Sequence, residues 1–174
     1  ATSFVSLVLY YNDSLETVDF SGITEFGGDV IFYYNYSLDM PDFSAITTVQ
    51  GDWALYYGDA TGLDLSNVGV IGGTLHAYYP DNFDELDLTG MTELGGIYLY
   101  NTEVSELDFS SLTVPMSQTF DLRYNYYLET IDWPTFGDLE YDFYLYNNYY
   151  ERDIEAGSLT STGRSVYIYE SYVP

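Results

Sequence analysis

The feature that most constrains the fold is an internal repeat with a period of 22 or 23 residues. Its clearest element is a tetrad of Asp, a large apolar residue, Ser or Thr, and a variable residue, which recurs in steps of 23, 22, 23, 21 and 24 residues. The tetrads begin at Asp19, Asp42, Asp64, Asp87, Asp108 and, in a weaker copy, Asp132. Such a period is typical of proteins that stack one structural unit many times.

Two further motifs keep the same phase. One has two apolar residues separated by a single residue, followed by Tyr-Tyr-Asn or a variant of it, and its eight copies begin at Leu7, Val30, Trp53, Leu75, Ile97, Phe120, Phe143 and Val166. The other is a glycine pair at 27–28, 72–73 and 95–96, with degenerate copies at 50–51 and 137–138. We therefore expect a single repeat domain over residues 1–174, with residues 149–165 as a divergent last coil.

The apolar residues of the repeat alternate, as in Leu7 and Leu9 or Phe143 and Leu145, which indicates strands rather than helices. The sequence thus predicts a mainly all-β, parallel β-solenoid with about seven to eight coils of 22–23 residues. Glycine pairs and asparagines are expected to supply corner conformations with positive φ. Stacked coils lie roughly 4.8 Å apart, so the rod is expected to be roughly 35 to 40 Å long.

The order of residues within a repeat resembles the receptor L-domain branch of leucine-rich-repeat proteins. The resemblance rests on Leu7-x-Leu9-x-x-Asn12-x-x-Leu15, then Val18-Asp19-Phe20, Ile23 and the glycine pair at 27–28, and it extends over most of the chain. It implies a solenoid scaffold for extracellular recognition, hence a surface or secreted binding or structural protein. The chain departs from that family in its tyrosine content and in lacking cysteine-rich caps, so no ligand site is carried over.

Charge excludes several classes of partner. The chain has 28 acidic residues against three basic ones and a formal net charge of −25, which repels nucleic acids and anionic lipid surfaces. Its longest apolar runs are too short for membrane insertion. Cysteine is absent, so disulfides and thiolate chemistry are excluded. From the missing lysine and cysteine and the start at Ala1 instead of Met, we expect an extracellular or cell-surface location.

Alternation places Leu7 and Leu9 inside the solenoid and the residue that follows them outside. The outward positions are Tyr10, Tyr33, Tyr56, Tyr78, Tyr100, Arg123, Tyr146 and Tyr169. A contiguous aromatic strip of this size favours an interface, either between copies of the chain or with a polysaccharide or protein ligand. In the alternative interpretation the tyrosines only stack on one another along the sheet.

A second column pairs tyrosines with asparagines at the coil corners. Its tyrosines are Tyr11, Tyr34, Tyr57, Tyr79 and Tyr124, and its asparagines are Asn12, Asn35, Asn101, Asn125 and Asn147. Buried asparagines at such corners hydrogen-bond the backbone of adjacent coils. Asn12 and Asn35 also begin glycosylation sequons, but a buried asparagine cannot carry a glycan, so the two interpretations compete.

The repeated aspartates stack like charges unless they are solvated, cap turns or bind a cation. The densest acidic group consists of Asp81, Asp84, Glu85 and Asp87, which we consider a candidate for a weak calcium site. No other cofactor motif is present. The single histidine, His76, has no Ser and Asp at a triad spacing, and no carboxylate pair can be singled out, so we expect no enzymatic activity.

Neither end of the repeat shows a polar cap, since the first rung begins near Phe4 and Val5 and the last one is 166–169. Uncapped solenoid ends can stack head to tail into a homopolymer. We expect a non-enzymatic extracellular structural protein that assembles into filaments through these ends and the tyrosine column. The alternative is a cell-surface adhesin module of receptor L-domain type that binds a carbohydrate or a protein.

Overall fold

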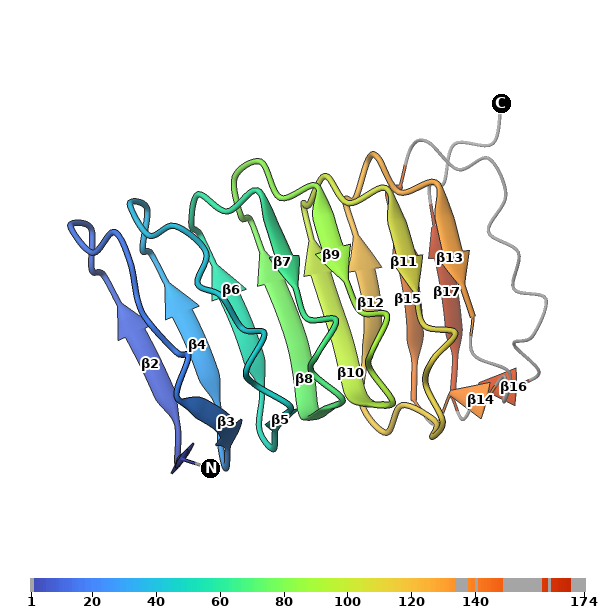
Figure 1. The fold of residues 1–174 in the computed structure, drawn as a ribbon. Coiled ribbons are helices and arrows are strands. Elements are labelled where there is room, and N and C mark those ends of the chain that lie inside the picture. The colour runs from blue at the N-terminus through green and yellow to red at the C-terminus, as the bar shows by residue number, and fades with distance from the viewer. Residues whose placement is uncertain (1, 134–137, 140, 149–160, 163, 170–174) are drawn as a thin grey trace.

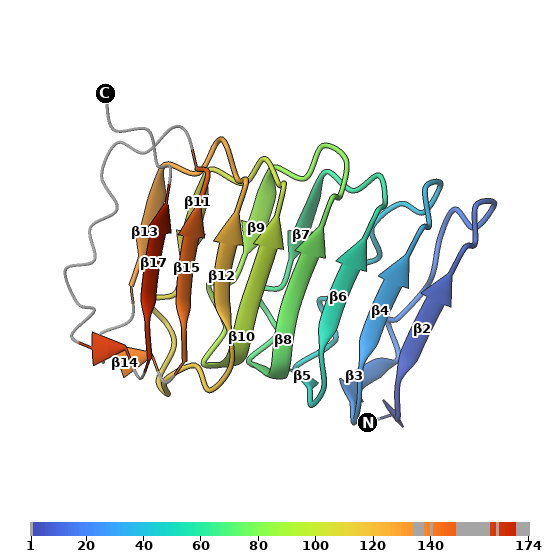
Figure 2. The same cartoon turned by 180° about the vertical axis from the view of Figure 1, so that it is seen from behind.

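The computed structural model describes residues 2–133, 138–139, 141–148, 161–162 and 164–169. These residues form a parallel β-solenoid and include no helix, as predicted. Eight strands stack along one side of the rod (Figure 2). The connection between the last two of them includes residues 149–160, which lie outside the described residues. The solenoid has about six turns, slightly fewer than the seven to eight coils predicted.

The strands form three rows along the rod (Figure 1). The main row contains β2 (Leu7–Tyr10), β4 (Val30–Tyr33), β6 (Trp53–Tyr56), β8 (Val70–Tyr78), β10 (Glu93–Tyr100), β12 (Phe120–Arg123), β15 (Phe143–Tyr146) and β17 (Val166–Tyr169). The second row contains β1 (Thr2–Phe4), β3 (Ile23–Phe26) and β5 (Thr48–Val49), and it continues into the first halves of β8 and β10. The third contains β7 (Gly62–Asp64), β9 (Glu85–Asp87), β11 (Glu106–Asp108) and β13 (Thr130–Asp132), while β14 (Asp138–Leu139) pairs with β16 (Ser161–Thr162).

All of the described strand pairs are parallel, and most keep the register of the repeat throughout; β1 with β3 and β8 with β10 each contain one register shift. Leu7 lies opposite Val30, Val30 opposite Trp53, and Trp53 opposite Leu75. Because each strand pairs with the strand one coil away, equivalent side chains form columns that run along the rod.

The core follows the predicted alternation. In β4, Val30 and Phe32 are buried, whereas Ile31 and Tyr33 are half-buried. The apolar residue of the tetrad, such as Phe20 or Phe43, enters the same core from the opposite side. The interior is therefore a single apolar column between the main row and the third row.

The predicted role of the glycines is wrong. None of the glycines that the structure describes has a φ in the left-handed region. Most of them are required for close approach instead, because a Cβ on Gly73, for example, would lie 2.6 Å from the backbone carbon of Gly51 in the preceding coil. A side chain at this position would hold neighbouring coils apart.

The left-handed corner is occupied mainly by tyrosine. Tyr11, Tyr34, Tyr57, Tyr79 and Tyr124 have φ between 50° and 60°, and Asn101 and Asn147 take the same position in their coils. This conformation costs a non-glycine residue roughly 1–2 kcal/mol. The stacking of the corner side chains between coils must offset that cost at each tyrosine.

Candidate functional surface: the tyrosine columns and the coil edges

The outward residues of the main row form one column, as predicted, in which an arginine replaces tyrosine once. Strand pairing places each member beside its equivalent in the next coil, and the members are Tyr10, Tyr33, Tyr56, Tyr78, Tyr100, Arg123 and Tyr146. The backbone of Tyr169 pairs in register with Tyr146, and its side chain lies outside what the structure describes. We call the column of outward residues the strand column. The corner tyrosines Tyr11, Tyr34, Tyr57, Tyr79 and Tyr124 form a parallel corner column directly beside it.

The rings of the corner column stack face to face. The ring centroids of Tyr11 and Tyr34 lie 4.8 Å apart, those of Tyr34 and Tyr57 4.7 Å, and those of Tyr57 and Tyr79 5.8 Å, with interplanar angles of 11° or less. Edge-to-face contacts join the two columns, as between Tyr33 and Tyr34 at 4.7 Å. Such pairs contribute about 0.5–1.5 kcal/mol each beyond burial, so the columns hold successive coils together.

The ring faces are open at the first coil. Tyr10 is 56% exposed and Tyr11 is 55% exposed, whereas Tyr33, Tyr34 and Tyr56 are less exposed and count as half-buried. Inside the corner column the faces of Tyr34 and Tyr57 are covered by neighbouring rings, whereas the strand-column rings from Tyr33 to Tyr100 are tilted against one another. The surface offered to a ligand therefore differs between the first coil and the interior of the columns.

Several phenols of the columns have a raised pKa, which favours their neutral form. Desolvation, a hydrogen bond to Tyr78 and neighbouring phenols raise the pKa of Tyr57 to about 12. Hydrogen bonding to Tyr79 and desolvation raise the pKa of Tyr100, and desolvation raises the pKa of Tyr33. A charged phenolate at Tyr33 or Tyr57 would lie against other phenols, which disfavours its ionisation.

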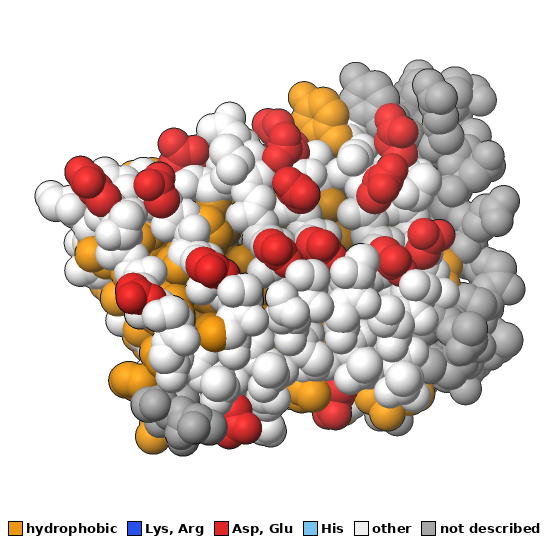
Figure 3. Space-filling model, viewed as in Figure 1, with side chains coloured by type: hydrophobic (Ala, Val, Ile, Leu, Met, Phe, Trp, Pro, Cys, Tyr) orange, Lys and Arg blue, Asp and Glu red, His pale blue; other side chains and the backbone are white. Residues whose placement is uncertain are grey.

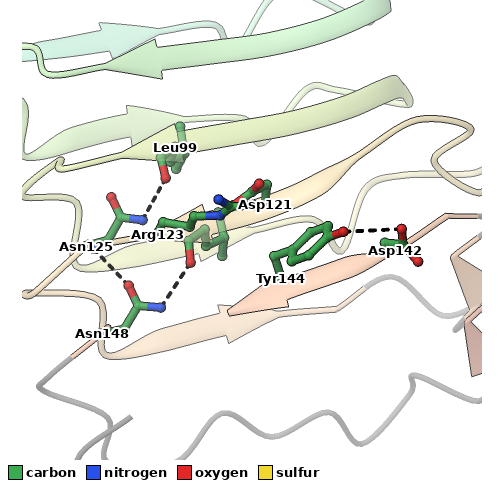
Figure 4. A network of polar contacts seen from close by, with 8 residues as sticks. Leu99, Asp121, Arg123, Asn125, Asp142, Tyr144 and Asn148 are labelled. Atoms are coloured by element: carbon green, nitrogen blue, oxygen red, sulfur yellow. Dashed lines mark hydrogen bonds and ion pairs between the residues drawn. The ribbon is translucent and has the colours of Figure 1, made fainter. Parts of the chain in front are cut away.

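An ion pair interrupts the strand column at Arg123 (Figure 4). Its Nε donates to Oδ1 of Asp121 at 2.7 Å, and its guanidinium lies 4.9 Å from the ring centre of Tyr144. Asp121 is buried, so desolvation raises its pKa while Arg123 opposes the shift. A buried carboxylate requires such a partner, which explains why an arginine replaces tyrosine in this coil.

His76 lies in the outward column next to the strand column. Its ring lies between those of Tyr56 and Tyr98, at 6.0 and 5.9 Å between centroids, and its Nε2 is 3.9 Å from Oδ2 of Asp52. Desolvation lowers its pKa, and the nearby Asp52 carboxylate opposes that shift. The histidine therefore belongs to the aromatic surface.

The asparagines form the predicted structural ladder, with a shift in its membership. Oδ1 of Asn125 accepts from the backbone N–H of Thr102 at 3.0 Å, and its Nδ2 donates to the carbonyl of Leu99 at 3.0 Å. Asn148 repeats these bonds one coil later (Figure 4). The predicted members Asn101 and Asn147 instead occupy the left-handed corner, because the strand register aligns both with Tyr124, and the ladder position after them is taken by Thr102 and Asn148.

Both sequon asparagines belong to this ladder. Asn35 is 5% exposed, and its Nδ2 donates to the carbonyls of Leu9 and Tyr33. Nδ2 of Asn12 donates to Oδ1 of Asn35 at 3.1 Å. A glycan on either nitrogen would replace these hydrogen bonds, so glycosylation stays a prediction that competes with the folded ladder.

A further ladder of side-chain-to-backbone hydrogen bonds lies directly before the main strands, and it was not predicted from the sequence. Ser6 Oγ accepts from the N–H of Asp29, Asp29 Oδ1 from that of Asp52, and Asp52 Oδ1 from that of Thr74. Asp142 and Ser165 repeat the contact near the last coil. The recurrence of Ser, Asp or Thr directly before the first apolar residue of the main strands was the signal that could have revealed this ladder.

The tetrad aspartates cap turns. In the first five tetrads, Oδ1 accepts the backbone N–H two residues later, as from Ser21 to Asp19, Ser44 to Asp42 and Ser66 to Asp64. The weaker sixth copy has proline at that place and so lacks the donor. The hydrogen bonds at Asp19, Asp42 and Asp64 lower the pKa of these three carboxyl groups. The column of tetrad aspartates is therefore a series of local Asx turns.

Acidic side chains form rows on the face that carries the third row of strands (Figure 3). Of the predicted calcium ligands, Asp84, Glu85 and Asp87 line a shallow groove of about 350 Å³ together with Glu106, Asp108 and Asp132. Asp81 instead forms a backbone bridge with Asp59. No His, Asp or Glu side chains in the described part of the chain form a group of three or more that could hold a metal ion, so calcium binding stays a prediction.

Both outermost coils expose interior-facing apolar residues. Leu7 and Leu9 of β2 are partly exposed, and Val166 and Ile168 of β17 are 49% and 61% exposed. The same alternation occurs in both strands, so the two edges are alike in pattern. The divergent coil predicted at 149–165 lies largely outside the described residues.

Comparisons do not assign the chain to a family. No protein-family model, curated protein or solved structure matches the sequence. Within the described residues there is no helix of the length and apolarity needed to cross a bilayer. The architecture is compatible with the solenoid type to which the sequence motif is similar, and its parallel β-solenoid fold is what the structure establishes.

Proposed function

We propose that the protein is a non-enzymatic, extracellular structural protein whose copies stack head to tail into filaments. The observation that carries this proposal is the pair of complementary edges. β2 pairs only with β4 and β17 only with β15 among the described strands, and the interior-facing residues of both are exposed. A second copy placed after β17 would set Leu7 opposite Val166 and Leu9 opposite Ile168, and would continue the solenoid in register.

The tyrosine columns support the same contact. Their exposed ring faces are at the first coil, on Tyr10 and Tyr11, where a preceding copy would cover them. Tyr167, which stacks on Tyr144 at 4.8 Å, is 49% exposed at the opposite edge. In the register given above, the ring of Tyr167 would pack against Val8 of the second copy, which is 57% exposed.

Charge opposes this assembly at low salt. Residues 1–87 contain 14 acidic residues and no basic one, whereas all three arginines lie at 123, 152 and 164. This asymmetry favours a head-to-tail contact over a head-to-head one. Because the Debye length falls to about 8 Å at physiological ionic strength, we expect filaments to form as salt rises.

Two edge variants test the geometry of the contact. Leu9→Asp blocks the first edge and Ile168→Asp the last, so each variant alone should stay monomeric in analytical ultracentrifugation while the unmodified chain forms filaments. An equimolar mixture should form dimers and stop there, because only one pair of intact edges remains. Val114→Asp, a charge at an exposed apolar residue of a middle coil, is the matched control and should assemble normally.

The opposite result would be equally clear. Dimers of one variant alone would indicate a head-to-head contact, and a monomeric unmodified chain at high salt and with millimolar calcium would contradict filament formation. Filaments that need calcium rather than salt would show bridging by carboxylates instead of screening. Circular dichroism of each variant would confirm that its fold is retained.

The adhesin alternative, a leucine-rich-repeat module of receptor L-domain type, has less support from the geometry. Sugar rings stack on exposed aromatic faces, and inside both columns these faces contact other rings, as between Tyr34 and Tyr57. A ligand of the column interior would have to bind phenol edges and hydroxyl groups. A glycan array probed with the monomeric Leu9→Asp variant would reveal such binding.

A further inference from the structure

The first two coils hold two face-to-face pairs of tyrosines at the most exposed end of the columns. The centroids of Tyr10 and Tyr33 lie 4.7 Å apart with 15° between the ring planes, and those of Tyr11 and Tyr34 lie 4.8 Å apart with 11°. Tyr10 and Tyr11 are more than half exposed. An oxidant in solution can therefore reach one phenol of each pair while the other lies in contact with it.

Tyrosine is also the residue through which this chain can form covalent links between coils. The chain has no cysteine, and its three basic residues are all arginines, so disulfides and lysine-based links are excluded. It contains 22 tyrosines. Phenol coupling needs neither cysteine nor lysine, so it is a covalent link that this composition allows.

We propose that the pairs Tyr10–Tyr33 and Tyr11–Tyr34 are sites of oxidative phenol coupling, which joins the first coil covalently to the second. The oxidant is hydrogen peroxide acting through a peroxidase-type one-electron catalyst. The reaction needs only one chain, so it goes beyond the proposed assembly and does not depend on it.

Coupling of one pair of phenols consumes one molecule of hydrogen peroxide. Each phenol loses one electron and its hydroxyl proton, which gives two phenoxyl radicals. The radicals join through a new carbon–carbon bond between ring positions ortho to oxygen, and the two displaced ring hydrogens return to the oxygens to restore both phenols. Hydrogen peroxide accepts the two electrons and two protons, its O–O bond breaks, and two water molecules form.

The first coil favours this reaction for two reasons. Tyr10 and Tyr11 are more than half exposed, so solvent water can accept the proton that each of these phenols releases on oxidation. The rings must also turn to bring their ortho carbons together. Among the described strands none covers the outer side of β2, so the rings of Tyr10 and Tyr11 have the space to turn.

The test uses the whole chain at a dilution where it is monomeric, treated with hydrogen peroxide and a peroxidase. Dityrosine fluorescence reports coupling, and cleavage at acidic residues followed by mass spectrometry locates it, because Asp13, Glu16, Asp19, Glu25 and Asp29 separate the two coils. The expected product joins the peptide with residues 10–11 to the peptide with residues 33–34. Its mass is lower than their sum by two hydrogen atoms for each link.

Phenylalanine variants give the matched comparison. The double variant Tyr10→Phe/Tyr11→Phe keeps both rings but removes the reactive phenols, and it should lose this linked peptide entirely. Tyr127→Phe, at a 51% exposed tyrosine outside both columns, should keep it. Absence of the linked peptide from the unmodified chain, its persistence in the double variant, or coupling only between chains would overturn the proposal. Failure of filament formation would leave this result unaffected.

Discussion

The first coil and the middle coils share one sequence motif, yet they are held in place very differently. Leu7 and Leu9 in β2 are partly exposed, whereas Trp53 and Leu55 in β6 are at most 3% exposed. β2 pairs with one strand and β6 with two. In a stacked repeat, the stability of a coil therefore comes from its neighbours as much as from its own residues.

The largest expected difference is in the core. Leu75→Ala removes a buried side chain that lies between coils on both sides, and should lower the free energy of unfolding by about 2–5 kcal/mol. Leu9→Ala should cost about 1 kcal/mol, since this side chain already contacts water. Urea denaturation of monomeric protein measures both values. Equal costs would show that the first coil is as well supported as the middle.

The asparagine ladder gives the next largest contrast. Asn125→Ala leaves the buried N–H of Thr102 and carbonyl of Leu99 without their partner, which should cost about 2–4 kcal/mol. Asn12→Ala, at the first coil, should cost about 1 kcal/mol or less because its surroundings are partly solvated. Asn125→Asp is a useful control, since it keeps the acceptor and removes the donor. A larger loss for Asn12→Ala than for Asn125→Ala would contradict the comparison.

Alkaline pH tests the interior of the tyrosine columns. The pKa of Tyr57 is raised to about 12, above the value of 10.0 for an unperturbed phenol. The folded state then binds more protons than the unfolded state above pH 10, so the stabilisation is complete below that pH and is lost as pH rises through about 12. The thermal midpoint should fall across this window, and less steeply for Tyr57→Phe. An identical pH profile for this variant would exclude Tyr57 as a contributor.

The smallest effect is expected in the aspartate ladder, because its contacts are made within one coil. Asp64→Ala removes the acceptor for the N–H of Ser66 and should cost about 0.5–1 kcal/mol. Asp64→Asn keeps an acceptor and should be nearly neutral. Because this hydrogen bond lowers the pKa of Asp64, its stabilisation is present above pH 3.8 and is lost on acidification. A cost comparable to that of Asn125→Ala would show that the turns also join coils.

The sequence predicted what depends on periodicity. Alternation and repeat length placed Tyr10 beside Tyr33 and buried Val30 and Phe32, because strand geometry allows few other arrangements. The outward column was thus found, and so was the ladder role of Asn35 and Asn125.

Features that arise from contacts between coils were not predictable in this way. Local preference favours glycine or asparagine with positive φ, yet Tyr34 adopts it because its ring stacks on Tyr11 and Tyr57. The direction of the rings, which decides how much face a ligand can meet, likewise follows from that stacking. Asn101 shows the same limit, because only the strand register reveals that it stands at the corner position of Tyr124 and that Thr102 stands at the ladder position of Asn125.

The strand register has a consequence for how such a chain can change in length. Strands β4 and β8 both pair with β6, which lies between them. Removing residues 53–74, which include β6, would therefore bring Leu75 opposite Val30 and Tyr78 opposite Tyr33. Each position of the main row would then lie beside its equivalent in the next remaining coil, and the rod would be shorter by one coil. A deletion of half that size would set tyrosines against the acidic face. Gene segments encoding whole coils can therefore be duplicated or lost without redesigning the rest of the protein.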